Sequence, residues 1–392
     1  MKIETTAVHA GDRKKAGASI PVTTPIYTAA SYIYEQTETL DRVFGREIPG
    51  DSYARYENPT NRALEELISS LECGHTSLAC SSGMMALQFA LQAALIDRRK
   101  KIVAAQALYG ATIRLLHSVF EPMGVECAFV DICNLDEVQA ALAEHKPGCV
   151  LMETISNPLL RVGQMDKIAE MVREAGAALV VDNTFATPRM VRPLTLGAHL
   201  VCHSLTKYLA GHGDVLGGSI TCDAGHAEIL RQLGRTAGPL LGPFESYLAM
   251  RGIKTFPLRF ERQCANALRV AEWLGKHPKV GNVYFPALAS HPDRQTVERL
   301  FPPGYYGAMI SFEIRDAKRE QIFDFLDRLK LIVRATSLGD VHSMMLYPAM
   351  SSHRELAPRQ RERLGILDNL VRLSVGIEAV EDIVADLDQA LG

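Results

Sequence analysis

A lysine and an aspartate each follow an apolar stretch of this chain, and their types suit one chemistry. Lys207 comes directly after the apolar run 200–203, with the hydroxyls of Ser204 and Thr206 beside it. A lysine amine can form a Schiff base with an aldehyde, and the two hydroxyls can hydrogen-bond a phosphate. Asp182 ends an earlier apolar run and could keep a pyridine nitrogen protonated. A lone lysine after a strand is more often a solvated loop residue, so this interpretation depends on the other strand ends.

A third strand end offers a cradle for the same phosphate. Ser82, Gly83 and Met84 lie where the apolar run 76–80 turns into a long helical pattern. Small residues there let backbone N–H groups approach an anion, and the helix N-terminus adds partial positive charge. The same residues would also make an ordinary helix cap and turn.

Two further loops add an aromatic ring and an amide. Tyr109 follows the apolar run 102–105 and could stack on a flat ring, although many such tyrosines only cap a core. Asn157 follows the run 149–152 and could donate to a ring hydroxyl. Ligands of open parallel sheets bind outside the carboxyl ends of the strands, so the convergence of these strand ends favours a shared site. The set predicts pyridoxal phosphate, whose protonated ring accepts electrons from a carbanion.

The apolar runs that carry these groups alternate with helical patterns between residues 61 and 250. This alternation predicts an α/β fold with a mainly parallel seven-stranded sheet covered on both faces. The runs are 76–80, 102–105, 127–130, 149–152, 178–181, 200–203 and 218–221.

The remainder of the chain divides into an arm and a second domain. Residues 1–60 contain several prolines and little helical periodicity, which predicts an arm that makes no core of its own. A helical stretch over 244–273 leads into a smaller C-terminal α+β domain with apolar runs such as 308–314 and 371–375. The predicted parts are an arm over 1–60, a cofactor-binding domain over 61–250 and a C-terminal domain over 251–392.

Composition narrows the class of protein. The chain has 392 residues, of which 47% are hydrophobic and 22% charged, and this is enough to bury a large core. A formal net charge of −3 gives no reason to expect a nucleic acid or a membrane as partner. Eight cysteines without a Cys-x-x-Cys pair, and an N-terminus unlike a signal peptide, predict a cytoplasmic location. His199 and His203 have a spacing that binds metal on a helix, but they fall in a predicted strand, so we expect no metal site.

Beyond these patterns, the chain resembles the cysteine and methionine metabolism family of pyridoxal phosphate enzymes nearly end to end. The family includes cystathionine and methionine gamma-lyases, cystathionine gamma-synthases and acylhomoserine sulfhydrylases. The most specific stretches are Tyr53-Ala54-Arg55-Tyr56-Glu57-Asn58-Pro59-Thr60, Ser82-Gly83-Met84, Asp182-Asn183-Thr184, Ser204 to Tyr208, Met250 to Thr255, Ser337-Leu338-Gly339-Asp340 and Val371 to Gly376. The resemblance implies an aspartate-aminotransferase-like fold of type I and a homotetramer built from dimers with shared active sites.

The same resemblance implies a role for each candidate residue. Lys207 would be the Schiff-base lysine and proton carrier, Asp182 the partner of the pyridinium nitrogen, and Tyr109 the stacking ring that also acts near the gamma position. Phosphate ligands would be Ser82, Gly83, Met84, Ser204 and Thr206, with Tyr53 and Arg55 contributed by a neighbouring subunit. Arg372 would bind the substrate carboxylate, and Ser337 and Asn157 would complete the pocket for the amino acid head.

The reaction within the family depends on the pocket for the side chain. Cystathionine-processing lyases of the family tend to have acidic residues where this chain has Ser52 and Thr336, and methionine gamma-lyases have a cysteine where it has Ala111. The stretch 341–350 is unusually apolar and contains His342, Met344, Met345 and Met350. These departures predict a neutral, methionine-rich pocket.

Such a pocket favours gamma-elimination on a small-molecule amino acid with a gamma substituent, giving 2-oxobutanoate and ammonia. Methionine, homocysteine, cystathionine and an atypical substrate such as canavanine remain open as substrates. The alternative is gamma-replacement, as in cystathionine gamma-synthases and acylhomoserine sulfhydrylases.

Overall fold

The computed structural model describes residues 1–13, 18–354 and 358–392. Its larger sheet has seven strands, and each lies where an apolar run predicts it. They are β1 (Thr76–Cys80), β2 (Lys101–Ala105), β3 (Glu126–Val130), β4 (Cys149–Glu153), β5 (Ala178–Asp182), β6 (Leu200–Ser204) and β7 (Gly218–Cys222). The order across the sheet is β1-β7-β6-β5-β4-β2-β3. The sheet is mainly parallel, as predicted, because only β7 runs antiparallel to its neighbours β1 and β6.

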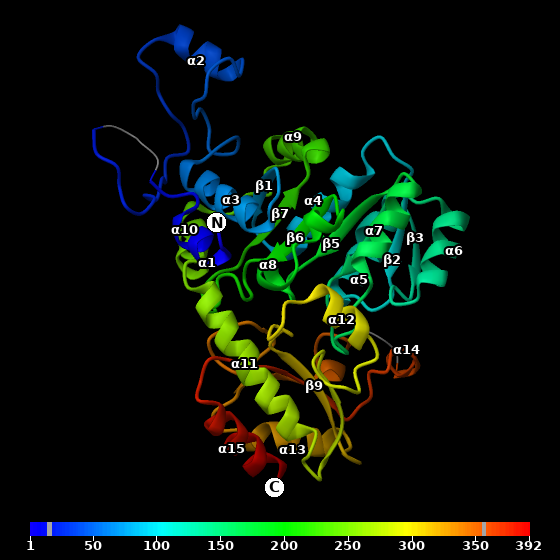
Figure 1. Cartoon of the computed structure of the whole chain (residues 1–392). Coiled ribbons are helices and arrows are strands. Elements are labelled where there is room, and N and C mark those ends of the chain that lie inside the picture. The colour runs from blue at the N-terminus through cyan, green and yellow to red at the C-terminus, as the bar shows by residue number, and fades with distance from the viewer. Residues whose placement is uncertain (14–17, 355–357) are drawn as a thin grey trace.

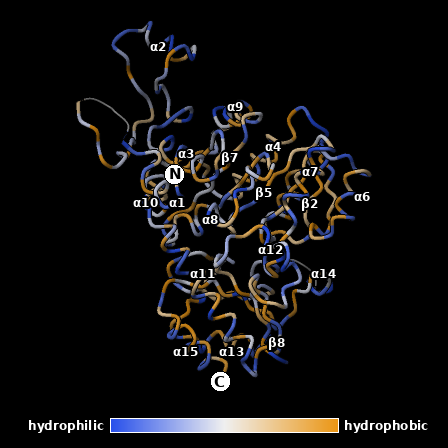
Figure 2. The backbone as a smooth tube through the Cα atoms, in the orientation of Figure 1, coloured by the Kyte–Doolittle hydropathy of each residue, from blue (hydrophilic) through white to orange (hydrophobic). Residues whose placement is uncertain are grey.

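The central strands are buried on both faces, which explains their continuous apolar character. All five residues of β4 are buried, and so are the first four of β5 and of β6. Helices α4 (Gly83–Leu95), α6 (Leu135–His145) and α7 (Met165–Glu174) pack against the sheet. The hydrophobic residues concentrate along these strands, while the polar ones lie toward the outside (Figure 2). Parallel strands covered by helices are stabilised chiefly by this burial.

The strand directions bring the predicted ligand-binding groups to one edge. Strands β2, β4, β5 and β6 pair in parallel, and β1 points the same way because β7 is antiparallel to both β1 and β6. The carboxyl ends of these five strands therefore meet at one edge of the sheet, which faces the smaller part of the molecule (Figure 1).

The smaller part is built on a second sheet of five strands. They are β8 (Val280–Tyr284), β9 (Met309–Ile314), β10 (Val333–Arg334), β11 (Met344–Leu346) and β12 (Leu370–Ser374), in the order β10-β11-β12-β9-β8. The predicted runs at 308–314 and 371–375 correspond to β9 and β12. Helix α15 (Val380–Leu391) contacts α13 (Arg319–Arg328) and α11 (Phe256–Leu274). Helix α11 also contacts β8 and β9.

The predicted helical stretch over 244–273 is not one helix. It consists of α10 (Pro243–Ile253) and α11 (Phe256–Leu274), which meet at Lys254 and Thr255. Pro257 lies in the first turn of α11, where the missing N–H is tolerated, but it could not continue α10 because an interior position requires that donor. The single long helix was therefore wrong at this joint.

The N-terminal residues also differ from a wholly irregular arm. Helix α1 (Ile3–His9) packs on α3 (Pro59–Glu72) and α11 with Ala7 fully buried, whereas α2 (Thr37–Phe44) stands away from the rest of the chain (Figure 1). The prediction that residues 1–60 form an arm without a core of its own stays a prediction. The remaining helices are α5 (Gly110–Leu115), α8 (Thr187–Met190), α9 (Ala227–Ala237), α12 (Arg294–Leu300) and α14 (Pro358–Arg363). The three-part division by residue number stays a prediction.

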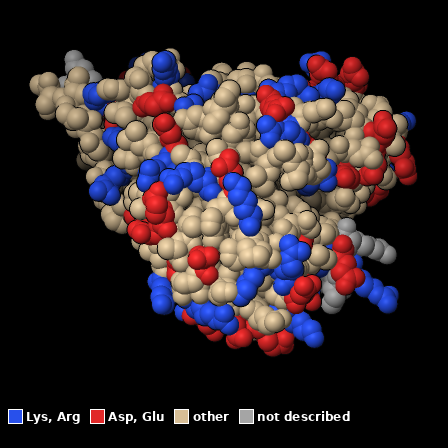
Figure 3. Space-filling model, turned by 60° about the horizontal axis from the view of Figure 1, so that its bottom comes forward, with Lys and Arg blue, Asp and Glu red and all other residues tan. Residues whose placement is uncertain are grey.

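The surface has no dominant charge on the face drawn in Figure 3, where acidic and basic side chains are interspersed. Within the described ranges, none of the helices is both long enough and apolar enough to cross a membrane.

Candidate active site

A cavity of about 470 Å³ opens at the carboxyl edge of the larger sheet. Most of the predicted site residues line it: Ser82, Gly83, Met84, Tyr109, Asn157, Asp182, Ser204, Thr206, Lys207 and Arg372. They come from the ends of five strands of one sheet and from β12 of the other. The cavity thus lies between the two sheets, and neither part of the molecule forms it alone.

The amine of Lys207 is partly buried in this cavity. Its Nζ donates a hydrogen bond to Ser337 Oγ over 3.0 Å, which places Ser337 beside the lysine although it is not a lining residue itself. Burial lowers the pKa of Lys207 to about 8, and the nearby positive charge of Arg372 acts in the same direction. A sizeable neutral fraction at neutral pH is what an amine needs to attack a carbonyl carbon.

The carboxylate of Asp182 lies at the end of β5 and is oriented by the following turn. The backbone N–H of Thr184 donates to Asp182 Oδ1 over 2.9 Å. Burial raises the pKa of Asp182, and the hydrogen bonds from Thr184 oppose that rise. A cationic ring nitrogen placed here would stabilise the ionised carboxylate.

The turn after β1 provides a close backbone approach. Ser82 caps α4, and its Oγ accepts from the Met85 N–H over 3.1 Å. A Cβ at Gly83 would stand 2.9 Å from the Cβ of Ser204, so only glycine lets the two strand ends approach this closely. Thr206 Oγ1 accepts from the Gly217 N–H over 3.0 Å, which fixes the turn after β6. These small residues and the N-terminus of α4 form a cradle of the kind that binds phosphate.

Arg372 is the charged group that the second sheet contributes to the cavity. It lies in β12 with only 3% of its surface exposed. Its Nη1 donates to Asn157 Oδ1 over 2.8 Å, and Nη2 contacts the backbone oxygen of Ser337 at 3.4 Å. Burial lowers the pKa of Arg372 to about 10, so the side chain stays cationic at neutral pH. Its Nε is buried without a hydrogen-bond partner among the described residues, which leaves donor capacity for a ligand.

Tyr109 lies in the loop after β2, and it is hydrogen-bonded to Glu153, the last residue of β4. Tyr109 precedes α5 and keeps 41% of its surface exposed, so its ring is available to a ligand. Its backbone N–H donates to Glu153 Oε1 over 2.6 Å. Burial raises the pKa of Glu153 well above its usual range, and the negative charge of Asp182 adds to the effect.

Sequence reasoning missed several residues of the cavity. Glu153 and Thr184 line it, and because Glu153 directly follows the apolar run 149–152 and Thr184 belongs to the stretch Asp182-Asn183-Thr184, their strand-end positions could have identified them. Arg114 of α5 lines it too, and no pattern in the sequence singled that residue out.

The prediction that methionines of the stretch 341–350 line the pocket was wrong. Met345 is buried in the hydrophobic core, and neither Met344 nor Met350 lines the cavity. From the apolar stretch 341–350, Leu346 does line it, and so does Thr336, which precedes that stretch. The wall for a substrate side chain therefore combines apolar groups and hydroxyls with the guanidinium of Arg114.

Tyr53 and Arg55 do not reach this cavity within one chain. Arg55 Nη1 donates to the backbone oxygen of Arg235, and its guanidinium lies over the ring of Tyr56 at 4.8 Å. Tyr53 is 44% exposed. Their predicted role in a neighbouring subunit's site stays a prediction.

The residues present fit pyridoxal phosphate. A weakly basic amine, a buried carboxylate and a cradle closed to any Cβ at Gly83 match the aldehyde, the ring nitrogen and the phosphate of that cofactor. Arg372 remains for the carboxylate of an amino acid.

Comparison with known proteins agrees with this chemistry. The family described as Cys/Met metabolism PLP-dependent enzyme matches residues 4–392. An L-methionine gamma-lyase of Fusobacterium nucleatum subsp. polymorphum is 40% identical over 390 residues, covering 99% of this chain and 97% of the relative. Other relatives, at 34–39% identity, are named cystathionine beta-lyase, cystathionine gamma-lyase, O-succinylhomoserine sulfhydrylase and O-acetyl-L-homoserine sulfhydrylase.

Solved structures show the same fold. The cystathionine gamma synthase of Xanthomonas oryzae pv. oryzae, in complex with cystathionine, matches with a TM-score of 0.91 at 36% identity, over 100% of this chain and 98% of that one. A putative O-acetylhomoserine (thiol)-lyase of Campylobacter jejuni subsp. jejuni NCTC 11168, solved with a pyridoxyl-lysine phosphate, matches with a TM-score of 0.92 at 26% identity over 100% of both chains. The chain belongs to the Cys/Met metabolism family of pyridoxal phosphate-dependent enzymes.

Proposed function

We propose that this enzyme catalyses gamma-elimination on a gamma-substituted L-amino acid, releasing 2-oxobutanoate and ammonia. The observation that carries the proposal is that one cavity holds the amine of Lys207, the carboxylate of Asp182 and the guanidinium of Arg372. None of the three forms an ion pair with another side chain in the described part of the chain. Each is therefore available to a charged or reactive group of a ligand.

The roles follow from the positions. Bound pyridoxal phosphate supplies an electron sink for a substrate carbanion. Lys207 would hold the cofactor covalently and, once displaced by the substrate amine, take the proton from the alpha carbon. Asp182 would keep the ring nitrogen protonated, and Tyr109 would stack on the ring and move a proton near the gamma position.

The rest of the cavity would fix the two ends of the cofactor–substrate pair. Ser82, Gly83, Met84, Ser204 and Thr206 would bind the phosphate, joined by Tyr53 and Arg55 of a neighbouring subunit. Arg372 would bind the substrate carboxylate with a planar pair of N–H donors, and its bond to Asn157 would fix the guanidinium plane. Ser337 would receive Lys207 when the amine is free.

Gamma-replacement is the second candidate, because the solved relatives include a cystathionine gamma synthase and other relatives are named O-succinylhomoserine and O-acetyl-L-homoserine sulfhydrylases. The hydroxyl of Thr336, which lines the cavity, would hydrogen-bond the acyl group of an acylhomoserine. An uncharged thioether such as methionine would use the apolar side chains of Leu338 and Leu346 instead.

A substrate panel distinguishes these reactions. The purified holoenzyme is incubated with methionine, homocysteine, cystathionine, canavanine and acylhomoserines, with and without sulfide or cysteine. We expect 2-oxobutanoate from at least one gamma-substituted substrate without an added thiol. A new amino acid formed only when sulfide or cysteine is present would replace elimination with transfer.

We also propose a homotetramer of dimers in the cytoplasm. The exposed arm with Tyr53 and Arg55, the family membership and the absence of these two residues from the chain's own cavity support a shared site. The eight cysteines, none of them disulfide-bonded, suit a reducing compartment.

A further inference from the structure

A buried polar network lies behind the cavity and ties four elements together. Glu72, near the end of α3, is fully buried, and its Oε1 lies 2.5 Å from His203 Nε2. The same oxygen accepts from Asn183 Nδ2 over 3.0 Å. Asn183 Oδ1 in turn accepts from Thr154 Oγ1 over 2.8 Å. One carboxylate oxygen thus connects α3 to the carboxyl ends of β6, β5 and β4.

The three residues of this network that lie at strand ends are each adjacent in sequence to a residue that lines the cavity. His203 precedes Ser204, Asn183 follows Asp182, and Thr154 follows Glu153; these three cavity-side neighbours all line the cavity. His203, Asn183 and Thr154 do not line it. Successive side chains of a strand point to opposite faces, so the network occupies the far side of the same strand ends.

The register makes the network a row across the sheet. Glu153 pairs with Asp182, and Asp182 pairs with Cys202. The next row contains Thr154, Asn183 and His203, and the parallel ladder continues through it, because the Thr154 N–H donates to the Asp182 oxygen and the Asn183 N–H to the Cys202 oxygen. Along the strands, the row of Thr154, Asn183 and His203 therefore lies between the row that contains Asp182 and the row that contains Ser204.

Stability alone is a weak explanation for this carboxylate. Glu72 Oε2 is buried without a hydrogen-bond partner among the described residues. Burying a carboxylate with an unsatisfied oxygen costs stability that a well-packed apolar side chain would not. What the carboxylate provides instead is one acceptor for two donors on adjacent strands, which fixes the strand ends relative to one another.

We propose that Glu72 is a positioning residue whose Oε1 holds the ends of β4, β5 and β6 so that Glu153, Asp182 and Ser204 meet the cofactor correctly. The inference rests on the proposed cofactor roles of Asp182 and Ser204. It assigns the pre-organisation of the cofactor site to a residue that touches neither cofactor nor substrate.

The test compares two substitutions at one position. Glu72→Met keeps a similar length and removes the acceptor, whereas Glu72→Gln keeps an Oε1 that can accept from both donors. The dissociation constant of pyridoxal phosphate is measured on each apoprotein, and thermal unfolding is followed with and without cofactor. We expect Glu72→Met to weaken cofactor binding by at least about tenfold, about 1.4 kcal/mol, and Glu72→Gln by no more than about threefold.

The apo and holo melting curves separate positioning from plain stability. A ligand stabilises the native state by an amount that grows with the logarithm of the ligand concentration divided by the dissociation constant, so weaker binding narrows the gap between apo and holo melting temperatures. Glu313 provides the matched control, because it is a buried carboxylate of the other sheet that accepts from Tyr284 and Asn282. Glu313→Met should lower both melting temperatures and leave the gap and the dissociation constant unchanged.

Two further variants keep the proposal falsifiable if Glu72→Met does not fold. Thr154→Val removes only the last donor of the network and should weaken cofactor binding by a few-fold. His203→Asn removes the other contact of Glu72 Oε1 and should reproduce the narrowed gap between the apo and holo melting temperatures. An unchanged cofactor affinity in Glu72→Met, with apo and holo equally destabilised, would overturn the proposal. Covalent labelling of Lys207 by reduction of the wild-type holoenzyme separately tests whether the cofactor binds in this cavity.

Discussion

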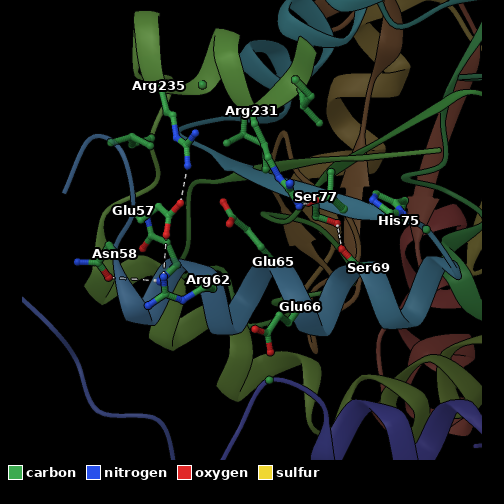
Figure 4. Close-up of a pocket in the computed structure, with 18 of the residues that line it drawn as sticks. Glu57, Asn58, Arg62, Glu65, Glu66, Ser69, His75, Ser77, Arg231 and Arg235 are labelled. Carbon is green, nitrogen blue, oxygen red and sulfur yellow. Dashed lines mark hydrogen bonds and ion pairs between the residues drawn. The ribbon is translucent and has the colours of Figure 1, made fainter. Parts of the chain in front are cut away.

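Two cavities of this chain contain many charged groups, and they differ in whether those groups form ion pairs within the protein. The larger, about 1060 Å³, lies between α3, β1 and α9 (Figure 4). Its charges are mostly matched within the protein: Arg235 Nη2 lies 2.6 Å from Glu57 Oε1, and Arg62 Nη1 lies 2.9 Å from Glu57 Oε2. In the smaller cavity, about 470 Å³, neither Lys207 nor Asp182 forms an ion pair with another described residue.

This difference indicates that charged groups without an ion-pair partner, and not the volume of the cavity, identify the proposed active site. The larger cavity also has a perturbed acid, since burial raises the pKa of Glu65 to about 7. Glu65 Oε1, however, accepts from the backbone N–H of Ala79 over 2.9 Å. Ala79 belongs to β1, an edge strand of the sheet, so this carboxylate satisfies an otherwise open edge. By contrast, Lys207 of the smaller cavity, whose pKa is lowered, donates to the side-chain hydroxyl of Ser337 and not to the backbone of a strand edge.

The largest expected effect comes from removing the unmatched amine. Lys207→Ala should lower the elimination rate by at least about 10³-fold, because both the covalent anchor and the alpha-proton base are lost. Reduction of the wild-type holoenzyme with borohydride, followed by peptide mapping, should place the cofactor on Lys207. A label on Lys254, which pairs with Asp12, would contradict the assignment. Glu65→Gln in the larger cavity should leave the rate nearly unchanged.

Asp182→Asn tests the unmatched carboxylate and should have the next largest effect. The fold and much of the cofactor occupancy should persist, but losing a charge-assisted bond in a dry site costs about 2–4 kcal/mol of transition-state stabilisation. Steady-state rates and cofactor absorbance measure the two outcomes. If activity stays within a few-fold of wild type, Asp182 only caps the turn with Thr184.

Arg55 connects the two cavities in the proposed assembly. It lines the larger cavity of its own chain, and we propose that it binds the phosphate in the smaller cavity of a neighbouring subunit. Arg55→Ala should weaken cofactor affinity by about tenfold to a hundredfold, the loss of a contact worth about 1.5–3 kcal/mol. Mixing Arg55→Ala with Lys207→Ala after reversible dissociation should restore a fraction of wild-type activity. No recovery despite demonstrated subunit exchange would show that Arg55 does not act in trans.

The smallest effect is a pH dependence. The pKa of Lys207 is lowered to about 8, and only the neutral amine attacks the cofactor aldehyde. The neutral fraction grows about tenfold per pH unit below that pKa and saturates above it. Cofactor uptake by the apoprotein, followed by stopped-flow absorbance, should therefore rise with pH and level off above about pH 8. A rate still rising past about pH 10 would indicate an ordinary, solvated lysine.

Much of the fold could be predicted because the central strands of the larger sheet are buried on both faces. Such strands read as continuous apolar runs, and all seven lie where the runs are. The site could be predicted for a related reason: parallel strands bring their carboxyl ends to one edge, so residues directly after the runs must meet. Lys207, Asp182, Ser82, Tyr109 and Asn157 do line one cavity.

The errors fall where side-chain direction or a local break decides the outcome. The stretch 341–350 is apolar, but the pairing of β11 with β12 buries Met345 in the core and leaves Leu346 to the cavity. The helical pattern over 244–273 continues across a joint that Pro257 enforces. Periodicity reports neither the direction of a particular side chain nor a joint between two helices with similar patterns.

The sequence by itself determined the strands, their polar ends and the chemical types gathered there, because those depend on local patterns and on the common direction of parallel strands. Only the tertiary structure decided which charges remain unmatched. Arg372 reaches the cavity from the second sheet, and Glu72 meets His203 across 131 positions of the chain. Burial and hydrogen bonding between such distant residues set the pKa of Lys207 and connect the strand ends, and no local pattern encodes those contacts.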